Sequence, residues 1–323
     1  MWFNRQHPLE QITHRKPPSE WDSFLSEPVL YLTRKLWELR NDLPFTPSIP
    51  ITVVCISDTH NTTPDLPAGD ILIHAGDLTE NGTYDELVAQ ISWLDSQPHH
   101  HKLVIGGNHD TLLDPESDPP PSSSSPSSEP GTSHEHELSE RERRRAAIMW
   151  GSVQYLSSSS TNIKVRDRSL NVYGSPRTPR QGKGPYSAFK YDRCDDEKAW
   201  KGQIPSGTDI LITHGPPKTH LDMNGIGCLA LLEETWRRRP GLHVFGHIHY
   251  AGGQTEKVAF DGLQHKVEQT ILDRGGVGNL IMVVWEWLKG LWRPKVARHI
   301  LVNAAMIWGN KNEKRRKPIV VQI

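Results

Sequence analysis

The sequence predicts an α/β protein in which helices pack against layered β-structure. Short runs rich in β-branched apolar residues recur from residue 51 onward, as in Ile51–Ile56 and Ile71–Ala75. After the second run, Leu87, Ile91 and Leu94 are spaced at i, i+4 and i+7, which is the periodicity of an amphipathic helix. Apolar strands that alternate with helices are typical of sheets covered by helices, so this fold class is the expected one.

Composition excludes several classes of protein. The 323 residues include 37 Lys and Arg against 38 Asp and Glu, so the net charge of −1 gives no bulk attraction for a nucleic-acid polymer. Three widely spaced cysteines exclude a disulfide framework and a Cys-type zinc site, and favour a reducing compartment. Histidine is in excess, with 17 residues, which makes the positions of these histidines of interest.

The N-terminal region, residues 1–48, is expected to be a helical extension. A helical pattern over roughly 19–41 is broken at Pro28 and is followed by a Pro-rich linker. The first residues contain no apolar stretch typical of a secretory signal peptide, so we expect a cytoplasmic protein. Residues 49–323 are then expected to form the main domain.

Further elements follow in order along this main domain. Thr83 and Glu86 have the spacing of a capping box, which predicts a helix start. Apart from the first two strands, the expected elements are a strand at Leu103–Ile105, a hairpin of Ile163–Val165 with Leu170–Tyr173, strands at Ile210–Thr213 and His243–Phe245, a helix at about 228–238 between these two, and a closing pair of strands, Leu301–Ile307 with Ile319–Ile323.

Five of the apolar strands end in residues that commonly bind metals. The endings are Ser57-Asp58-Thr59-His60, Gly76-Asp77, Gly107-Asn108-His109-Asp110, His214-Gly215 and Gly246-His247-Ile248-His249. The carboxyl ends of strands in open α/β sheets form the ligand crevice, so side chains from these separate segments can converge there. The recurrence of the pattern makes ordinary turn residues a poor explanation.

The ligand types indicate a particular chemistry. Carboxylate, amide and imidazole groups without thiolate suit Mn, Fe or Zn. The candidate ligands are too many for one ion, and two cations that share a carboxylate can hold a phosphoryl oxygen and activate a bridging water. The carboxylates of Asp58 and Asp77 would leave such a centre net cationic, so it would attract a phosphate.

The series D-x-H, GD, GNH-D, H-G and GH-x-H resembles the motifs of the calcineurin-like metallophosphoesterase superfamily over roughly residues 51–250. The stretches IHAGDLT, GNHD, ILITHGPP and HVFGHIH are most similar to the small cyclic-nucleotide-phosphodiesterase-like branch related to animal brain metallophosphoesterases. The resemblance implies a β-sandwich flanked by helices, with a binuclear centre of two divalent or mixed-valence ions. It also implies a phosphoester substrate, either a monoester or a diester, hydrolysed by hydroxide held at that centre.

Residue roles also follow from the resemblance. The implied ligands are Asp58, His60 and His249 for the first metal, Asn108, His214 and His247 for the second, and Asp77 as the bridge between both. His109 would lie beside the leaving group, where it either hydrogen-bonds the phosphate or protonates the departing alkoxide. An alternative is that His109 only positions Asn108. Arg177 lies in a loop that the family uses as a cleft wall, which predicts a phosphate contact.

Two insertions have no counterpart in the compact family core. Residues 115–140 are Pro/Ser-rich and almost free of large apolar groups, so we interpret them as a disordered insertion. Residues 253–298 contain a Trp-rich segment, and its apolar run 280–292 is too short to span a bilayer. Other polar positions have structural interpretations: His74 and His243 as buried histidines, His99–His101 as a solvated turn, and Lys314–Lys317 as a solvated charge run.

The Trp-rich segment leaves two interpretations open. As an interfacial helix over 277–293 it would place Trp285, Trp287 and Trp292 at a membrane surface, and basic residues follow at the C-terminal end of the segment. Alternatively, it packs on the core or on the N-terminal helix.

From the strand-end motifs and the family resemblance, we predict that the protein is a metallophosphoesterase. The alternatives are a membrane-peripheral or scaffold protein that uses the fold for binding, and a biosynthetic hydrolase of a non-nucleotide phosphate; the oligomeric state stays open.

Overall fold

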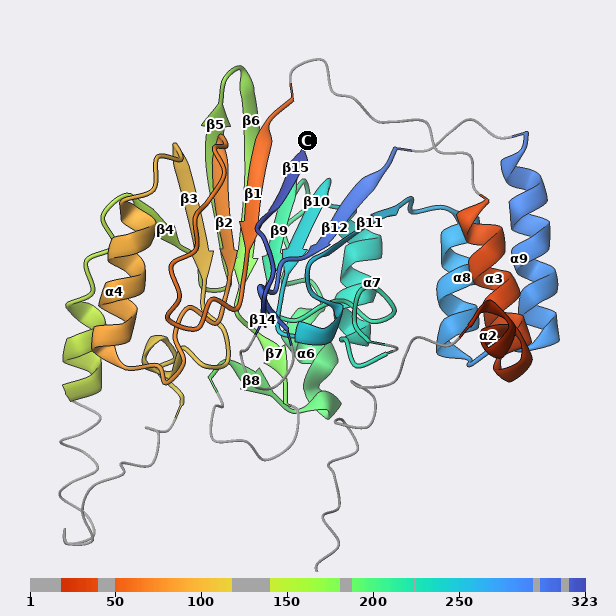
Figure 1. Ribbon diagram of the computed structural model, residues 1–323, viewed down its shortest axis with the longest axis horizontal. Coiled ribbons are helices and arrows are strands. Elements are labelled where there is room, and N and C mark those ends of the chain that lie inside the picture. Colours follow the sequence, from red (N-terminus) through yellow and green to blue (C-terminus); the bar gives the residue numbers. More distant parts are fainter. Residues whose placement is uncertain are drawn as a thin grey trace, which may run out of the picture. The chain divides into compact units, whose positions relative to one another are not determined.

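The computed structural model describes residues 19–39, 50–117, 140–180, 188–223, 225–292, 297–308 and 314–323. It divides into two compact units, which are shown in Figure 1. The larger unit comprises Thr46–Lys257 and His299–Ile323, and the smaller comprises Met1–Phe45 and Val258–Arg298. Most of the Pro/Ser-rich insertion, residues 118–139, lies outside the described residues.

Two mixed sheets form the centre of the larger unit. The first has the order β15 (Ile319–Gln322), β1 (Thr52–Ile56), β2 (Ile71–Ala75), β3 (His101–Ile105) and β4 (Val153–Tyr155). The second has the order β11 (Gln254–Val258), β12 (His299–Asn303), β10 (Leu242–Phe245), β9 (Ile210–Thr213), β6 (Arg168–Ser175) and β5 (Ser159–Val165). Strands β1 to β4 are parallel, as are β6, β9, β10 and β12, so the carboxyl ends within each set share one edge.

Alternating side chains give each sheet a face toward the other sheet and a face toward helices. Val53 contributes to the core between the sheets, whereas its neighbour Val54 packs on the outer side with Leu94 of α4. In the second sheet, Leu211 packs on the outer side with Leu231 of α7. The helices concerned are α4 (Tyr84–Asp95), α6 (Asp196–Trp200) and α7 (Leu229–Arg238). In Figure 1, α4 lies beside the first sheet and α7 beside the second. The predicted α/β class, with sheets flanked by helices, is therefore confirmed.

Most of the predicted elements are present. Thr83 caps α4 by accepting a hydrogen bond from the backbone N–H of Glu86, and the reciprocal bond completes the capping box. The predicted hairpin is the antiparallel pair β5 and β6, in which Val165 lies opposite Arg168. Pro28 begins a second N-terminal helix, because proline suits the first helical turn and interrupts the preceding helix.

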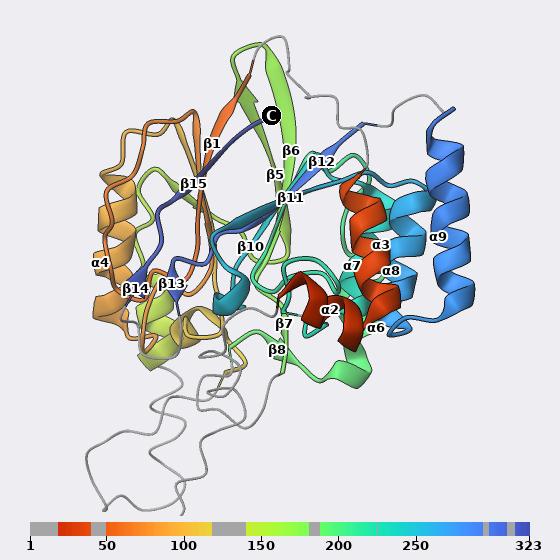
Figure 2. The same cartoon turned by 45° about the vertical axis from the view of Figure 1, so that its right-hand side comes forward.

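The expected pairing of the two closing strands is wrong. Strand β12 pairs with β10 in the second sheet, and β15 pairs antiparallel with β1 in the first, as Figure 2 also shows. Between them the chain crosses from one sheet to the other, where Ala305 forms a bridge with Ser57 and the N–H of Met306 donates to the carbonyl of Ser57. A short ribbon of β13 (Ile307–Trp308) and β14 (Lys314–Arg315) follows this crossing. A further small pair joins β7 (Thr178–Pro179) to β8 (Lys190–Tyr191).

The smaller unit is helical and draws on two distant parts of the sequence. Its helices are α2 (Glu20–Ser26), α3 (Pro28–Glu38), α8 (Gly262–Leu272) and α9 (Val277–Gly290). Val267 and Val283 are buried between helices and pack with the partly buried Leu36 and Trp37 of α3. The Trp-rich helix α9 therefore packs on the N-terminal helix α3, as one of the two interpretations expected. Within the described part of the chain, no helix combines the length and apolar character needed to cross a bilayer.

Candidate metal centre

The chain bends sharply where the motif-bearing strands end. Asp58, His60, Asp77 and His247 all have positive φ, at 55°, 43°, 55° and 66°. Residues other than glycine rarely adopt this conformation, and such strain is concentrated at functional sites. Hydrogen bonds hold the bends in place, because the N–H of Asp58 donates to the carbonyl of Gly76 and that of His60 to the carbonyl of Asp77. The bends direct polar side chains to the common carboxyl edge of the strands.

Two glycines permit this crowding. A Cβ added at Gly246 would lie 2.2 Å from Oδ2 of Asp58, and one added at Gly107 would lie 2.3 Å from Oδ1 of Asp77. Both distances are far below van der Waals contact, so no side chain fits at either position. Glycine before His247 and before Asn108 is therefore a requirement of the close approach of separate loops to the two carboxylates.

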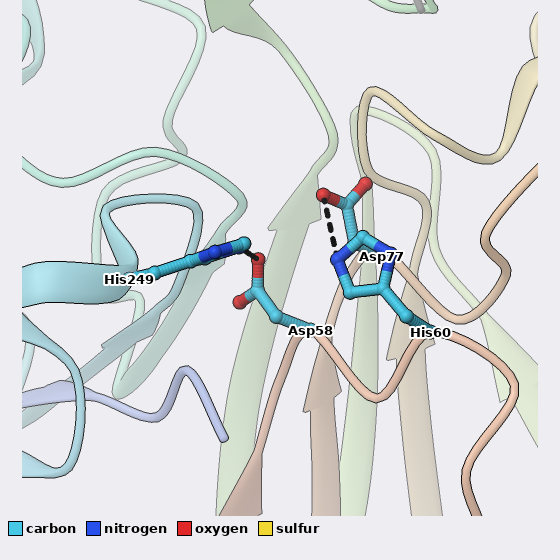
Figure 3. Close-up of side chains that lie close together, drawn as sticks. All are labelled: Asp58, His60, Asp77 and His249. Carbon is cyan, nitrogen blue, oxygen red and sulfur yellow. Dashed lines mark hydrogen bonds and ion pairs between the residues drawn. The ribbon is translucent and has the colours of Figure 1, made fainter. Parts of the chain in front are cut away.

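The first group of side chains contains Asp58, His60, Asp77 and His249, drawn in Figure 3. One ligand atom from each lies within 4.8 Å of the others. Nε2 of His249 is 3.0 Å from Oδ1 of Asp58, and Nε2 of His60 is 3.8 Å from Oδ2 of Asp77. These residues follow β1, β2 and β10, so the group joins both sheets.

The second group contains Asp77, His214 and His247. Nε2 of His214 lies 3.3 Å from Oδ2 of Asp77 and 3.1 Å from Oδ1 of Asn108. The structure thus brings together all seven side chains that the sequence predicts as ligands, and Asp77 belongs to both groups. Its carboxylate therefore lies where the two groups meet.

The side chains fit divalent cations on two further observations. Nε2 of His60 and Nε2 of His247 are buried and have no hydrogen-bond partner among the described residues. A buried polar atom without a partner is costly, and coordination to a cation would remove that cost. The donor set of imidazole, carboxylate and amide groups contains no thiolate, which matches Mn, Fe or Zn sites.

The ionisation states suit metal binding. Burial opposes ionisation of Asp77, but electrostatic interaction with His214 and other neighbouring histidines outweighs it and holds the pKa of Asp77 well below its ordinary value. Burial and the neighbouring His214 lower the pKa of His247 to about 3, so its ring is neutral at pH 7. Burial also disfavours a charged His214, yet Asp77 raises the pKa of His214 to about 9. Binding of a cation to His214 would therefore displace the proton from the imidazole of His214.

His109 lies at the same centre. Its backbone N–H donates to Oδ1 of Asp77 at 2.8 Å, and its ring packs edge-on against the ring of His60 with centroids 4.5 Å apart. Nδ1 of His109 lies 2.8 Å from the carbonyl oxygen of Glu80. Because a carbonyl only accepts, this contact places a proton on Nδ1.

Glu80 is a residue of the site that the strand-end motifs do not identify. Oε2 of Glu80 lies 3.1 Å from Nδ1 of His60, and Glu80 forms a third group with His60 and His109. A carboxylate there can orient the imidazole of His60, which is one of the predicted ligands. In the sequence, the signal that could have identified Glu80 is its position three residues after Asp77.

Asp110 has a structural role beside the site. It accepts hydrogen bonds from the N–H groups of Gly107, Leu78 and Thr79, and these bonds hold two of the loops together.

Other predicted residues have different surroundings. The guanidinium of Arg177 donates to the carbonyl of Ala199 in α6 at 2.7 Å, and a phosphate contact by Arg177 stays a prediction. His74 and His243 are buried, as their structural interpretation expected. His74 contacts Oγ1 of Thr59 at 2.9 Å, and His243 contacts Oγ1 of Thr213 at 2.8 Å.

Comparison with known proteins agrees with this geometry. The model of the family described as calcineurin-like phosphoesterase matches residues 51–251. Human metallophosphoesterase domain-containing protein 1 is 38% identical over 209 residues, which are 62% of this chain and 61% of the human protein. The UPF0046 protein K07C11.7 of Caenorhabditis elegans is 32% identical over 247 residues, covering 72% of this chain and 76% of that protein.

A third relative is much longer than this chain. It is named probable rhamnogalacturonate lyase C, from Emericella nidulans, and is 43% identical over 279 residues, which are 84% of this chain but 24% of the relative. The chain thus covers less than two thirds of the length of this relative and of the human one. The family model covers more than half of the chain and includes every strand-end motif described above. On this ground, the chain belongs to the calcineurin-like phosphoesterase family.

Proposed function

We propose that this protein is a metal-dependent phosphoesterase that hydrolyses a phosphomonoester or a phosphodiester at a binuclear centre. The observation that carries the proposal is the pair of ligand groups joined at Asp77. In this assignment Asp58, His60 and His249 hold the first cation, and Asn108, His214 and His247 hold the second. Two cations sharing one carboxylate are a recurring arrangement for displacement at phosphorus.

The bound cations would polarise a phosphoryl oxygen and supply an activated water. The chain provides the rest. Asp58 and Asp77 supply two negative charges against the two divalent cations, so a net positive field remains to orient an anionic substrate. His109 is held beside Asp77 by its backbone N–H, and its ring would offer a proton or a hydrogen bond to the leaving oxygen. Glu80 and the carbonyl contact of His109 fix the orientation of the neighbouring rings.

Variants of the bridge and of one further ligand test the proposal. Protein loaded with Mn²⁺ or Fe²⁺ is expected to hydrolyse p-nitrophenyl phosphate or bis-p-nitrophenyl phosphate, with release of p-nitrophenol as the readout. Asp77→Ala and His214→Ala should abolish this hydrolysis and reduce the bound metal. His243→Gln is the matched control, because it alters a buried histidine of an adjacent strand that is not an assigned ligand. Full metal-dependent activity in both ligand variants would show that the site is wrong.

The substrate class is open to direct measurement. Hydrolysis of a cyclic nucleotide, with identification of the product, tests the resemblance to the cyclic-nucleotide-phosphodiesterase-like branch. A biosynthetic hydrolase of a non-nucleotide phosphate is the alternative, and it would turn over small alkyl phosphates but not the cyclic nucleotide. Both outcomes use the same metal centre and differ only in the groups that contact the remainder of the substrate.

A second candidate function is contact with a lipid surface, and one feature of the smaller unit favours it. Helix α9 buries Val283, but the stripe on its outer side is apolar and exposed: Val277, Ile281, Trp285, Leu288 and, just beyond the helix, Trp292. The exposed fractions of Trp285 and Trp292 are 54% and 89%. An apolar stripe of this length that remains open to solvent marks an interaction surface.

The chemistry of the stripe fits a bilayer surface of anionic phospholipid. The 14-residue helix is about 21 Å long, too short to span a bilayer but suited to lying in its interface. Tryptophan rings favour the headgroup region. The sequence from Lys289 to His299 adds Arg293, Lys295 and Arg298 and contains no acidic residue, which complements anionic headgroups.

Flotation with vesicles of phosphatidylserine and phosphatidylcholine tests this contact. The wild type is expected to float with these vesicles, and the double variant Trp285→Asn, Leu288→Asn is expected to stay in solution. Trp21→Asn is the control, because it removes an exposed tryptophan of the same unit outside the stripe. A wild type that does not float, or that instead buries the stripe in a dimer detected by light scattering, would overturn the assignment.

A further inference from the structure

Arg316 contradicts the interpretation of residues 314–317 as a solvated charge run. One nitrogen of its guanidinium, Nη1, donates to the carbonyl oxygen of His249 at 2.7 Å. The same nitrogen donates to the carbonyl of Ile307 and, at 3.4 Å, to that of Ala305. Arg316 thus joins the turn that carries His249 to the segment that crosses between the two sheets.

The surroundings of Arg316 are shaped to hold it. Its backbone N–H donates to the carbonyl of Met306 at 2.7 Å, and its guanidinium lies over the ring of Trp308 at 5.6 Å from the centroid. A Cβ at Gly252 would lie 2.7 Å from Nη1, and one at Gly253 would lie 2.3 Å from Cδ of Arg316. The two glycines after His249 therefore leave the space that this arginine fills.

His249 is consequently fixed at two points. Its ring meets Asp58, with Nε2 3.0 Å from Oδ1, and its backbone carbonyl accepts from Arg316. The residue begins a single 3₁₀ turn, His249–Ala251, which has few hydrogen bonds of its own. Within the turn the same carbonyl accepts the N–H of Gly252 at 3.1 Å, and Arg316 adds the contact that ties it to the segment crossing between the sheets.

We infer that Arg316 is a positioning residue for the first metal: through the carbonyl of His249 it holds the imidazole of His249 at the place where that ring meets Asp58. This inference rests on the proposed function. All three carbonyl contacts are made by Nη1, and the plane of the guanidinium lies over the ring of Trp308. Lysine carries the same charge, but its nitrogen ends one bond short of the position of Nη1 and has no plane to lie over that ring. The role therefore depends on the shape of the guanidinium as well as on its charge.

Arg316→Lys and Arg316→Met test the inference by Mn²⁺ affinity, measured with isothermal titration on metal-free protein. Residues that orient ligands typically alter metal affinity by about 10–100-fold, and a loss of this size is expected at one of the two sites with the other unchanged. Hydrolysis should fall at limiting Mn²⁺ and recover at high Mn²⁺, since no reacting group has been removed. Circular dichroism establishes that the variants are folded.

Arg168→Lys is the matched control, because Arg168 also donates from Nη1 to a backbone carbonyl, that of Ile323, in the larger unit. It should bind Mn²⁺ like the wild type. If the Arg316 variants do not fold, Trp308→Leu removes the ring beneath the guanidinium while leaving Arg316 in place, and it should weaken one site by a smaller factor.

The results separate the inference from the proposed function. If the wild type binds two Mn²⁺ ions and both folded Arg316 variants bind them equally well, Arg316 has no positioning role and the phosphoesterase assignment stands. If the wild type binds neither Mn²⁺ nor Fe²⁺, the proposed function fails and the inference fails with it. Equal weakening at both sites, or in Arg168→Lys as well, would indicate general destabilisation and would also overturn the inference.

Discussion

The hydrogen bonds of His109 define what its ring can do. Its Nδ1 faces the carbonyl of Glu80, so the neutral ring carries its proton on Nδ1 and presents Nε2 as an acceptor. Only the protonated ring also carries a proton on Nε2. If His109 protonates the leaving group, its ring must therefore be charged. If His109 only positions Asn108, a charged ring is not required. These alternatives differ in their dependence on the leaving group.

His109→Gln distinguishes them. If His109 protonates the leaving group, kcat for an alkyl phosphate should fall by about 10²–10⁴-fold, because an alkoxide is a poor leaving group without a proton. The decrease for p-nitrophenyl phosphate should be much smaller, since p-nitrophenolate departs without one. Steady-state kinetics on the two substrates, together with metal analysis, provide the measurement. Equal decreases for both substrates would favour the positioning role.

At the scale of elements, strands β9 and β10 are joined by a buried histidine. His243 of β10 contacts Oγ1 of Thr213 in β9, one residue before the proposed ligand His214. Burial, with a smaller contribution from the charge of His220, lowers the pKa of His243 to about 3. The ring is therefore neutral in the folded protein, and the link between the strands depends on its staying neutral.

This group makes stability depend on pH. Below about pH 6.5 the unfolded chain binds a proton on His243, whereas the folded chain excludes this proton. The contribution of neutral His243 to the free energy of unfolding is therefore complete above pH 6.5 and is lost as the pH falls toward 3. Between pH 7 and pH 5, the free energy of unfolding should fall by about 2 kcal/mol more in the wild type than in His243→Gln. Urea unfolding of the metal-free proteins measures the difference; identical pH dependence would contradict it.

Element positions were largely predictable because they follow from local patterns. The capping box at Thr83, the helix break at Pro28 and the apolar runs of β1 and β2 are each encoded within a few residues. The sheet that a short apolar strand joins is not encoded locally. Strands β12 and β15 look like hairpin partners in sequence, yet β12 pairs with β10 in one sheet and β15 pairs with β1 in the other.

In the candidate site, the residues in the strand-end motifs were predictable and the residues that support them were not. Asp58, His60, Asp77 and the other ligands carry their signal in strand-end motifs, and the structure brings them together. Glu80 and Arg316 could not be found in this way. Glu80 meets the ring of His60, and Arg316 meets backbone carbonyls, so both roles depend on the path of the folded chain.

At the scale of the whole molecule, the two units have separate cores. All seven assigned ligands belong to the larger unit, whereas Val283 is buried in the smaller one. Val283→Ala should destabilise the helical unit by roughly 2 kcal/mol, because it removes buried methyl groups and leaves a cavity. Hydrolysis of p-nitrophenyl phosphate should be unchanged. Thermal unfolding followed at 222 nm, with activity measured in parallel, tests this; equal loss of both would show that the units are coupled.

The pairing of β1 with β15 has a consequence for biosynthesis. Strand β1 is synthesised before β15, so Val53 and Cys55 find their antiparallel partners only when Val321 and Ile319 have been synthesised. Until then one edge of a very apolar strand has no neighbour from this chain, and such edges recruit other chains. Because contacts this distant in sequence also form slowly, newly made protein should depend on chaperones until translation reaches β15.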